Sequence, residues 1–180
     1  MKICLGYQRS IAGVGWKSVD VAGTPDILDD AFKLESIEDK SCEIIVASHI
    51  LEHGPYHGTT KERFIQVIDV LQLWNMKLVP HGRLFIGVPN FHWMVMHYLE
   101  VAENFHNADF DLAGPILGAG PDRKDMHTMI FNNKILEQAM FFAGFHDIEV
   151  LQRCPPEMLP QFNTSCADVR GLNMTGVANG

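Results

Sequence analysis

The chain has 180 residues, of which 47% are hydrophobic, so it is long enough to bury one core of ordinary size. The formal net charge is -8, and the densest basic spot, Arg123-Lys124, is followed at once by Asp125. Binding to a nucleic-acid backbone needs clustered Lys and Arg side chains, so this charge argues against nucleic acid as the main partner. The sequence has no run of about twenty apolar residues, so we expect no membrane-spanning segment.

The cysteines and the N-terminus bear on the compartment. None of the four cysteines (Cys4, Cys42, Cys154 and Cys166) has CxxC spacing, and the first residues show no signal-peptide pattern. We therefore expect reduced thiols in a cytoplasmic protein. The chain contains no internal repeat or low-complexity tract, which favours a single domain over residues 1–180.

The first part of the chain predicts two strands separated by a loop. Lys2–Leu5 is a short apolar stretch typical of a strand, and Trp16–Val21 reads as a second strand with Asp20 near its end. The connection between them runs from Gly6 to Gly15. It is shorter than the dozen or more residues of a usual βαβ crossover, so it has room for a turn or two of helix at most.

The next part predicts the central strand of the sheet. Pro25–Asp30 is a candidate turn or short helix, and Phe32–Ile37 is a candidate for a weak third strand. Ile44–Ala47 is continuously apolar, as expected of a strand buried on both faces of a parallel sheet. It ends in Ser48 and His49. In open α/β sheets ligands bind just past the carboxyl ends of the strands, so these two residues lie where a site is expected.

The rest of the chain predicts three helices and three strands. In order, they are a helix over Thr59–Leu78 that starts with the capping-box pair Thr59 and Glu62, a strand over Arg83–Val88, a helix over Phe91–Asn104, a helix over Asn133–Ala143 stopped by Gly144, and strands over His146–Leu151 and Val169–Met174. His106–Phe131 contains no long periodic element, which is typical of a functional lid or of a disordered segment. The pattern predicts an α/β fold.

Four stretches carry a resemblance to a known family. They are Gly15-Trp16-Lys17-Ser18-Val19-Asp20, Ala47-Ser48-His49-Ile50-Leu51-Glu52-His53, Leu78-Val79-Pro80-His81-Gly82-Arg83-Leu84, and Met126-His127 with Phe131 running into Ala143-Gly144-Phe145. Together they resemble the class I S-adenosylmethionine (SAM)-dependent methyltransferases, most closely a small bacterial type. The resemblance implies a doubly wound, mostly parallel, Rossmann-like sheet lacking a full first helix. It also implies SAM and its demethylated product SAH as ligands, and a small-molecule or saccharide-like methyl acceptor.

The resemblance also implies which residues meet the cofactor. The expected cofactor-binding residues are Leu5, Gly6 and Tyr7 after the first strand, Asp20 after the second, Glu35, Ser36 and Ile37 after the third, and Ser48 and His49 after the fourth. A carboxylate at the position of Asp20 can accept hydrogen bonds from ribose hydroxyls, as in dinucleotide folds. Glu35, Ser36 and Ile37 would lie near adenine, and Ser48 and His49 near the methionine end or the acceptor.

The first loop departs from the family pattern. The family carries Gly-x-Gly there, whereas Tyr7 and Gln8 follow Gly6 in this chain. Gln8 adds a Cβ and a long side chain where a glycine lets the backbone approach the ligand. The departure motivates an alternative hypothesis, in which the chain is a catalytically inactive binding or scaffold module of the same fold.

Methyl transfer needs donor and acceptor held in line, and an oxygen or nitrogen acceptor benefits from a base that takes its proton. Imidazole can titrate near neutral pH, so His49 and His53 are the candidate general bases. A structural role as a helix cap or loop anchor is an alternative for His53. His127, at the end of the long loop, is a candidate for reaching over the substrate or for anchoring that loop.

The histidines also raise a metal hypothesis. His49, His53 and His57 are four residues apart, and Glu52 adds a carboxylate, a combination that could serve a metal-dependent hydrolase. However, Gly54 and the proline after it would break a helix before His57, and the pattern is not HExxH. We therefore predict no metal site from the sequence.

Overall fold

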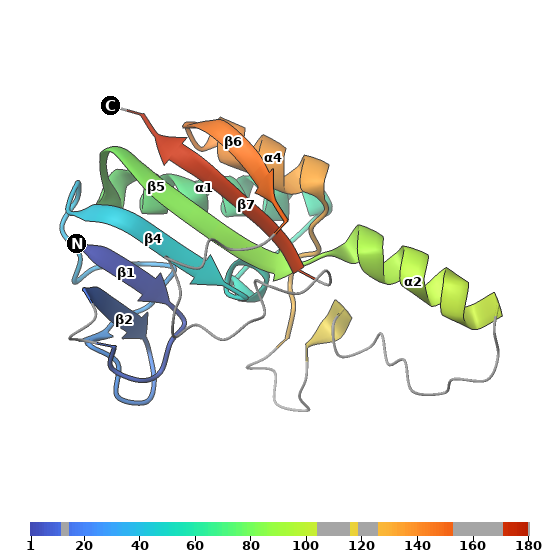
Figure 1. Ribbon diagram of the computed structural model, residues 1–180, viewed down its shortest axis with the longest axis horizontal. Coiled ribbons are helices and arrows are strands. Elements are labelled where there is room, and N and C mark those ends of the chain that lie inside the picture. Colours follow the sequence, from blue (N-terminus) through green and yellow to red (C-terminus); the bar gives the residue numbers. More distant parts are fainter. Residues whose placement is uncertain (12–14, 104–115, 119–125, 153–170, 180) are drawn as a thin grey trace.

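The computed structural model describes residues 1–11, 15–103, 116–118, 126–152 and 171–179 (Figure 1). In this part of the chain, seven strands form one sheet in the order β3-β2-β1-β4-β5-β7-β6. The strands are β1 (Lys2–Leu5), β2 (Trp16–Asp20), β3 (Ile27–Leu28), β4 (Cys42–Ser48), β5 (Leu78–Pro89), β6 (Phe145–Leu151) and β7 (Gly171–Ala178). Strand β7 is antiparallel to β5 and β6, whereas the other neighbours are parallel.

The helices are α1 (Thr60–Lys77), α2 (Phe91–Glu103) and α4 (Asn133–Phe142), with a single 3-10 turn, η1, at Leu51–His53. Helices α1 and α4 lie on the same face of the sheet, and α2 extends away from it at the carboxyl end of β5 (Figure 1). The predicted capping box at Thr59 and Glu62 is confirmed, with both reciprocal hydrogen bonds formed. None of the helices in the described ranges combines the length and apolarity needed to cross a membrane.

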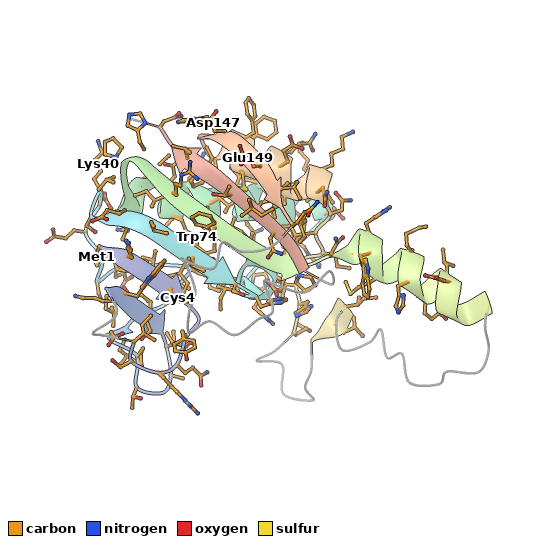
Figure 2. The ribbon with its side chains drawn as sticks, viewed as in Figure 1. Met1, Cys4, Lys40, Trp74, Asp147 and Glu149 are labelled. Atoms are coloured by element: carbon orange, nitrogen blue, oxygen red, sulfur yellow. The ribbon has the colours of Figure 1, made fainter. Side chains whose placement is uncertain are left out.

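The main core lies between the sheet and helices α1 and α4. Leu71 and Trp74 of α1 and Met140 of α4 are fully buried there against alternate residues of the strands, among them Ile45. Trp74, labelled in Figure 2, also donates a hydrogen bond from Nε1 to the carbonyl oxygen of Ala31 at 2.7 Å. Apolar residues on one face of each strand therefore explain why both helices pack on that side.

A smaller apolar cluster covers part of the opposite face near β1, on which Figure 2 labels Cys4. Its buried members are Cys4, Ile11, Trp16, Val46 and Phe85. Ile11 belongs to the loop after β1, and no described residue between β1 and β2 is helical. The expectation that a full first helix is lacking agrees with these residues. In the described residues, loop side chains such as Ile11 therefore cover this part of the sheet.

Two predictions near β3 are wrong. The third strand is Ile27–Leu28 and lies inside the stretch expected to be a turn or helix, whereas Phe32–Ile37 forms turns and contains no strand. Aspartates explain the turns, because Asp29 and Asp30 accept hydrogen bonds from nearby backbone nitrogens. Short polar side chains that bond locally in this way compete with regular secondary structure.

Later boundaries shift less. Strand β5 begins at Leu78, five residues before the expected start, with an irregularity opposite β4. Strand β7 runs to Ala178 instead of ending at Met174, while residues 169–170 lie outside the described ranges. Most of the expected functional loop His106–Phe131 also lies outside them.

Candidate functional site

The carboxyl ends of β1, β2 and β4 form the centre of the candidate site. Strand β1 pairs in parallel with both of its neighbours, so that Leu5 lies opposite Val19 and also opposite Ala47. The residues that follow, Gly6, Asp20 and Ser48, therefore come together at one edge of the sheet. The chain order reverses here, since β2 lies on one side of β1 and β4 on the other.

Gly6 has a conformation that requires glycine. Its φ is +75°, and a Cβ at this position would lie 1.9 Å from Cδ1 of Ile50. The Gly6 nitrogen donates a hydrogen bond to the Val19 carbonyl oxygen at 2.8 Å, which fixes the turn out of β1. Both the left-handed backbone and the close approach of Ile50 exclude a larger residue.

The two residues after Gly6 turn away from the strand ends. Tyr7 packs against the smaller apolar cluster, and the Gln8 carbonyl oxygen accepts a hydrogen bond from the Thr24 nitrogen at 2.8 Å. Gly23 permits this contact, because a Cβ there would lie 2.4 Å from the Gln8 oxygen. The loop that departs from the family pattern is thus joined to the β2–β3 connection.

The expected adenine-side residues are only partly at the strand ends. The Ser36 backbone nitrogen donates a hydrogen bond to Oδ2 of Asp29 at 2.7 Å, and Asp29 is the residue directly after β3. Glu35, the neighbour of Ser36, is exposed. Ile37 is 1% exposed and belongs to the main core, so its side chain cannot contact a ligand. Asp29 was missed by the sequence analysis, although it follows β3 as Asp20 follows β2.

Asp20 and Leu5 lie where the sequence analysis expected them. The Asp20 side chain is partly exposed and accepts a hydrogen bond at Oδ1 from the Ala22 nitrogen at 2.8 Å. Leu5 is 1% exposed, so only its backbone can take part in a site. Asp20 therefore offers an oriented carboxylate at the end of β2.

His49 leaves β4 in a strained conformation. Its φ is +53°, which is uncommon outside glycine, and its nitrogen donates to the Gly87 carbonyl oxygen at 2.8 Å. The turn brings His49 Nδ1 to 3.1 Å from Oε1 of Glu52. Strain of this kind persists only where the surroundings enforce it, and it is concentrated at functional sites.

Glu52 is the buried centre of a group of histidines. Its side chain is 1% exposed, and His53 Nε2 lies 4.0 Å from its Oε1. The rings of His53 and His127 meet edge to face, with their centroids 4.7 Å apart. Glu52, His53 and His127 each place one potential ligand atom within 4.8 Å of the others. The metal hypothesis named His57, which is exposed and does not belong to this group.

Thr128 connects the His127 segment to the loop after β4. Its nitrogen donates to the Glu52 carbonyl oxygen at 2.8 Å, and its Oγ1 donates to the Gly54 carbonyl oxygen at 2.6 Å. Arg63 of α1 donates from its guanidinium to the Thr128 carbonyl oxygen at 3.1 Å. Two loops far apart in the sequence are therefore held together beside Glu52. No local sequence pattern indicates this pairing, so Thr128 could not be predicted from the sequence.

Tyr56 is a buried phenol near Glu52. It is 2% exposed, and its hydroxyl has no hydrogen-bond partner among the described residues. Burial, and to a lesser extent the nearby charge of Glu52, raise the pKa of Tyr56 far above its ordinary value. The phenol is therefore neutral, and it brings no charge that would balance the carboxylate of Glu52.

A small pocket opens beside His127. Its volume is about 10 Å³, and it is lined by Pro89, Met94, Ile116, His127, Met129, Ile130 and Phe131. It lies between the start of α2 and the segment that carries His127. The pocket is far smaller than the roughly 300–1,000 Å³ of sites for drug-sized ligands, and its lining side chains are apolar except for the one imidazole.

Comparisons with known proteins identify the fold. No protein-family model matches the chain, and no curated protein matches it. Among solved structures, it is similar to a SAM-dependent methyltransferase from Thermotoga maritima, with a TM-score of 0.56 and 14% identity over 99% of this chain and 82% of that one.

Two further structures give the same result. A SAM-dependent methyltransferase from Archaeoglobus fulgidus has a TM-score of 0.52 and 13% identity over 97% of this chain and 84% of that one. The 1,6-didemethyltoxoflavin-N1-methyltransferase of Burkholderia thailandensis, solved with its substrate and S-adenosylhomocysteine, has a TM-score of 0.54 and 14% identity over 99% of this chain and 71% of that one. The chain therefore has the class I methyltransferase fold, as the motifs predicted.

Proposed function

We propose that this chain is a single-domain SAM-dependent methyltransferase that acts on a small molecule. The observation that carries the proposal is the convergence of Gly6, Asp20 and Ser48 at the point where the strand order reverses. Ligands of open α/β sheets bind at this point. The fold shared with SAM-dependent methyltransferases, one of them holding S-adenosylhomocysteine, supports the same choice of cofactor.

The residues at the strand ends fit the adenosine part of the cofactor. The oriented carboxylate of Asp20 would accept hydrogen bonds from the ribose hydroxyls. Asp29, with the Glu35-Ser36 turn bonded to it, would lie on the adenine side. These polar groups lie at neighbouring strands, in the order in which an extended nucleoside would meet them.

The backbone around Gly6 fits the methionine part. The glycine lets the chain turn closely at the end of β1, and the backbones of Leu5 and Tyr7 flank it. Ser48 and His49 would face this part from the end of β4. Ile50 packs against Gly6, so its side chain would form the apolar wall beside the methionine chain.

When bound, SAM supplies an electrophilic methyl group on a positively charged sulfur. The chain's own contribution is to orient the acceptor and to accept its proton. Glu52 lies beside Nδ1 of His49, which leaves Nε2 of His49 as the atom that would take the proton. His53 is the second base expected from the sequence. Its ring lies between Glu52 and His127, so it is less well placed than His49 to take a proton from the acceptor.

The pocket beside His127 favours an apolar acceptor over a saccharide. A sugar carries many hydroxyl groups, and each one buried without a partner costs binding free energy. The side chains of Met94, Met129 and Phe131 line the pocket. The only hydrogen-bonding groups among these three side chains are the methionine sulfurs, which are weak acceptors. The lining would therefore suit a small apolar portion of the acceptor beside one imidazole, and its side chains would have to move apart to admit that portion.

A non-catalytic role is the second candidate. The observation in its favour is the loop after Gly6, where Tyr7 and Gln8 are turned toward the smaller cluster and the β2–β3 connection. The chain would then have the methyltransferase fold and act as a binding module, and the loop after Gly6 would contact the β2–β3 connection instead of the cofactor. Cofactor binding distinguishes the two candidates.

The deciding experiment is calorimetric titration of the purified protein with SAM and with SAH. We expect binding with one site per chain, and a loss of affinity of roughly 10- to 100-fold in Asp20→Asn, since the carboxylate is replaced by a neutral amide. Asp69→Asn, on an exposed position of α1, is the matched control and should bind like the wild type. Absence of binding at millimolar ligand by a folded protein would refute the enzyme and support the non-catalytic module.

A further inference from the structure

We propose that Glu52, His53 and His127 form a binding site for one divalent transition-metal ion. One carboxylate oxygen and two imidazole nitrogens of these residues lie within 4.8 Å of one another. Glu52 and His53 come from the turn after β4, and His127 comes from the segment that precedes α4. This proposal departs from the sequence-based expectation of no metal. The sequence suggested His49, His53 and His57 with Glu52, whereas the group in the structure contains His127 and neither His49 nor His57.

The state of Glu52 is an independent observation that points to a cation. The side chain is 1% exposed, and neither carboxylate oxygen accepts a hydrogen bond from a described residue, although Nδ1 of His49 lies 3.1 Å from Oε1. An imidazole balances the charge of a carboxylate only when it is protonated. No Lys or Arg in the described ranges forms an ion pair with it. A buried carboxylate left without hydrogen bonds or a strong positive partner is unfavourable, whereas a bound cation would balance its charge.

The side chains around Glu52 supply the remaining ligands. His53 Nε2 lies 4.0 Å from Glu52 Oε1, and the His53 ring meets the His127 ring edge to face. Ligands of zinc lie about 2.0–2.2 Å from the ion, so donor atoms are at most about 4 Å apart. Small rotations of the two imidazoles would bring the three donors to these distances.

The position of the third ligand is fixed by the backbone. Thr128, the residue after His127, bonds through its nitrogen to the carbonyl oxygen of Glu52 itself. The ligand from the second loop is thus held against the residue that supplies the first one. Preorganisation of this kind reduces the rearrangement needed when an ion binds.

The donor set indicates the class of metal. Two imidazole nitrogens with one carboxylate oxygen suit zinc, manganese or iron(II), whereas magnesium and calcium prefer oxygen ligands. Three protein ligands leave coordination positions open, which is typical of catalytic sites. His127 also lines the small pocket beside α2, so this ligand lies between the proposed ion and that pocket.

What the ion would do for chemistry rests on the proposed function. The ion would polarise an acceptor oxygen bound at an open position. Binding of the ion itself needs no SAM. Failure of metal binding and failure of cofactor binding are therefore separate results.

The experiment is calorimetric titration of chelator-treated full-length protein with Zn²⁺, Mn²⁺ and Mg²⁺, combined with metal analysis after dialysis. We expect one Zn²⁺ or Mn²⁺ per chain, with Mg²⁺ binding at least about tenfold more weakly. Glu52→Gln and His127→Gln should each weaken Mn²⁺ binding by roughly 10- to 100-fold or more. Electron spin-echo spectroscopy of the Mn²⁺-bound protein should show coupling between the Mn²⁺ electron spins and imidazole nitrogen nuclei. His127→Gln removes one of the two imidazoles and should reduce this coupling.

His57→Gln is the matched control, because His57 is an exposed histidine of the same loop. It should leave the affinity and the nitrogen coupling unchanged. Circular dichroism and urea unfolding separate loss of ligands from loss of fold, and His127→Gln serves if the buried Glu52 variant does not fold. The proposal is overturned if the folded wild type binds no Zn²⁺ or Mn²⁺, or if His127→Gln binds them with wild-type affinity and coupling.

Discussion

The Glu52 carbonyl oxygen accepts a hydrogen bond from the Thr128 backbone nitrogen at 2.8 Å, and the Thr128 hydroxyl oxygen lies 3.2 Å from the same atom. The same hydroxyl lies 2.6 Å from the Gly54 carbonyl oxygen. One side chain therefore holds the segment of His127 against the turn that carries Glu52. Its removal should affect both the stability of the fold and the assembly of the histidine group.

We expect Thr128→Val to lower the free energy of unfolding by about 1–2 kcal/mol, because valine keeps the shape and leaves two carbonyl oxygens with fewer partners. Urea unfolding measures the change. Thr60→Val, at an exposed position in the first turn of α1, should change it by less than about 0.5 kcal/mol. Equal effects of the two variants would show that the Thr128 hydroxyl does not stabilise this contact.

Tyr56→Phe, unlike Thr128→Val, should not lower the free energy of unfolding. The Tyr56 hydroxyl is buried without a hydrogen-bond partner among the described residues, so its removal takes away a desolvated polar group. We expect the free energy of unfolding to stay unchanged or to rise by up to about 1 kcal/mol. Thermal and urea unfolding check this. A loss greater than about 1 kcal/mol would mean that the hydroxyl is bonded in the folded protein.

Gly6→Ala and Gly15→Ala form a matched pair. Both glycines have positive φ, at +75° and +80°, but a Cβ at Gly6 would lie 1.9 Å from Ile50, whereas a Cβ at Gly15 would meet nothing within 4 Å. We expect a cost of about 1–2 kcal/mol from the backbone at Gly15. Gly6→Ala should have the same backbone cost, and the clash of the new Cβ with Ile50 should lower the free energy of unfolding by a further ~1–3 kcal/mol, the cost of overpacking a core. Urea unfolding of both variants separates the two contributions.

A double-mutant cycle with Ile50→Ala tests the cause at Gly6. If the side chain of Ile50 is responsible, Gly6→Ala should be at least about 1 kcal/mol less destabilising in the Ile50→Ala background. Additive effects would place the cost in the backbone alone. Cofactor affinity of the four proteins would then show whether the Gly6 turn also positions the ligand.

Asp26 should make stability depend on pH in acid. It accepts hydrogen bonds from Ser10, Ile11 and Ser18. Burial by itself would raise the pKa of Asp26, but these bonds together hold it well below its ordinary value. A lowered pKa in the folded state means that the stabilisation is complete above the unfolded value, about 3.9, and is lost as the pH falls below it.

Urea unfolding between pH 6 and pH 3 measures this contribution. The wild type should lose stability on acidification, and Asp26→Asn should lose less because it has no carboxylate to protonate. Asp147→Asn, at an exposed residue labelled on β6 in Figure 2, is the control and should follow the wild type. Parallel curves for the wild type and Asp26→Asn would refute the role of this carboxylate.

Elements with a strong local pattern could be predicted from the sequence. Helix α1 has its capping box at Thr59 and Glu62 and an apolar stripe that includes Leu71, and its bounds differ from the prediction by one residue at each end. Strand β4 was recognised from the apolar run Ile44–Ala47. In both cases the residues that determine the element are its own.

Elements that depend on distant partners were missed. Strand β3 has two residues, Ile27 and Leu28, which pair only with Val19 and Asp20 of β2. Such a pairing leaves no periodic pattern. The candidate site divides in the same way: the motif around Glu52 lies in one stretch, whereas the approach of His127 and Thr128 depends on the packing of a second loop.

The position of β7 in the sheet has a consequence for the order of folding. This strand is the last in the described chain, yet it lies between β5 and β6 and pairs with both. During synthesis on the ribosome, β6 and its helix α4 must emerge before the strand that joins them to the sheet. The nascent chain would therefore expose the edge of β5 until residues 171–178 are available, and an exposed strand edge is open to intermolecular pairing.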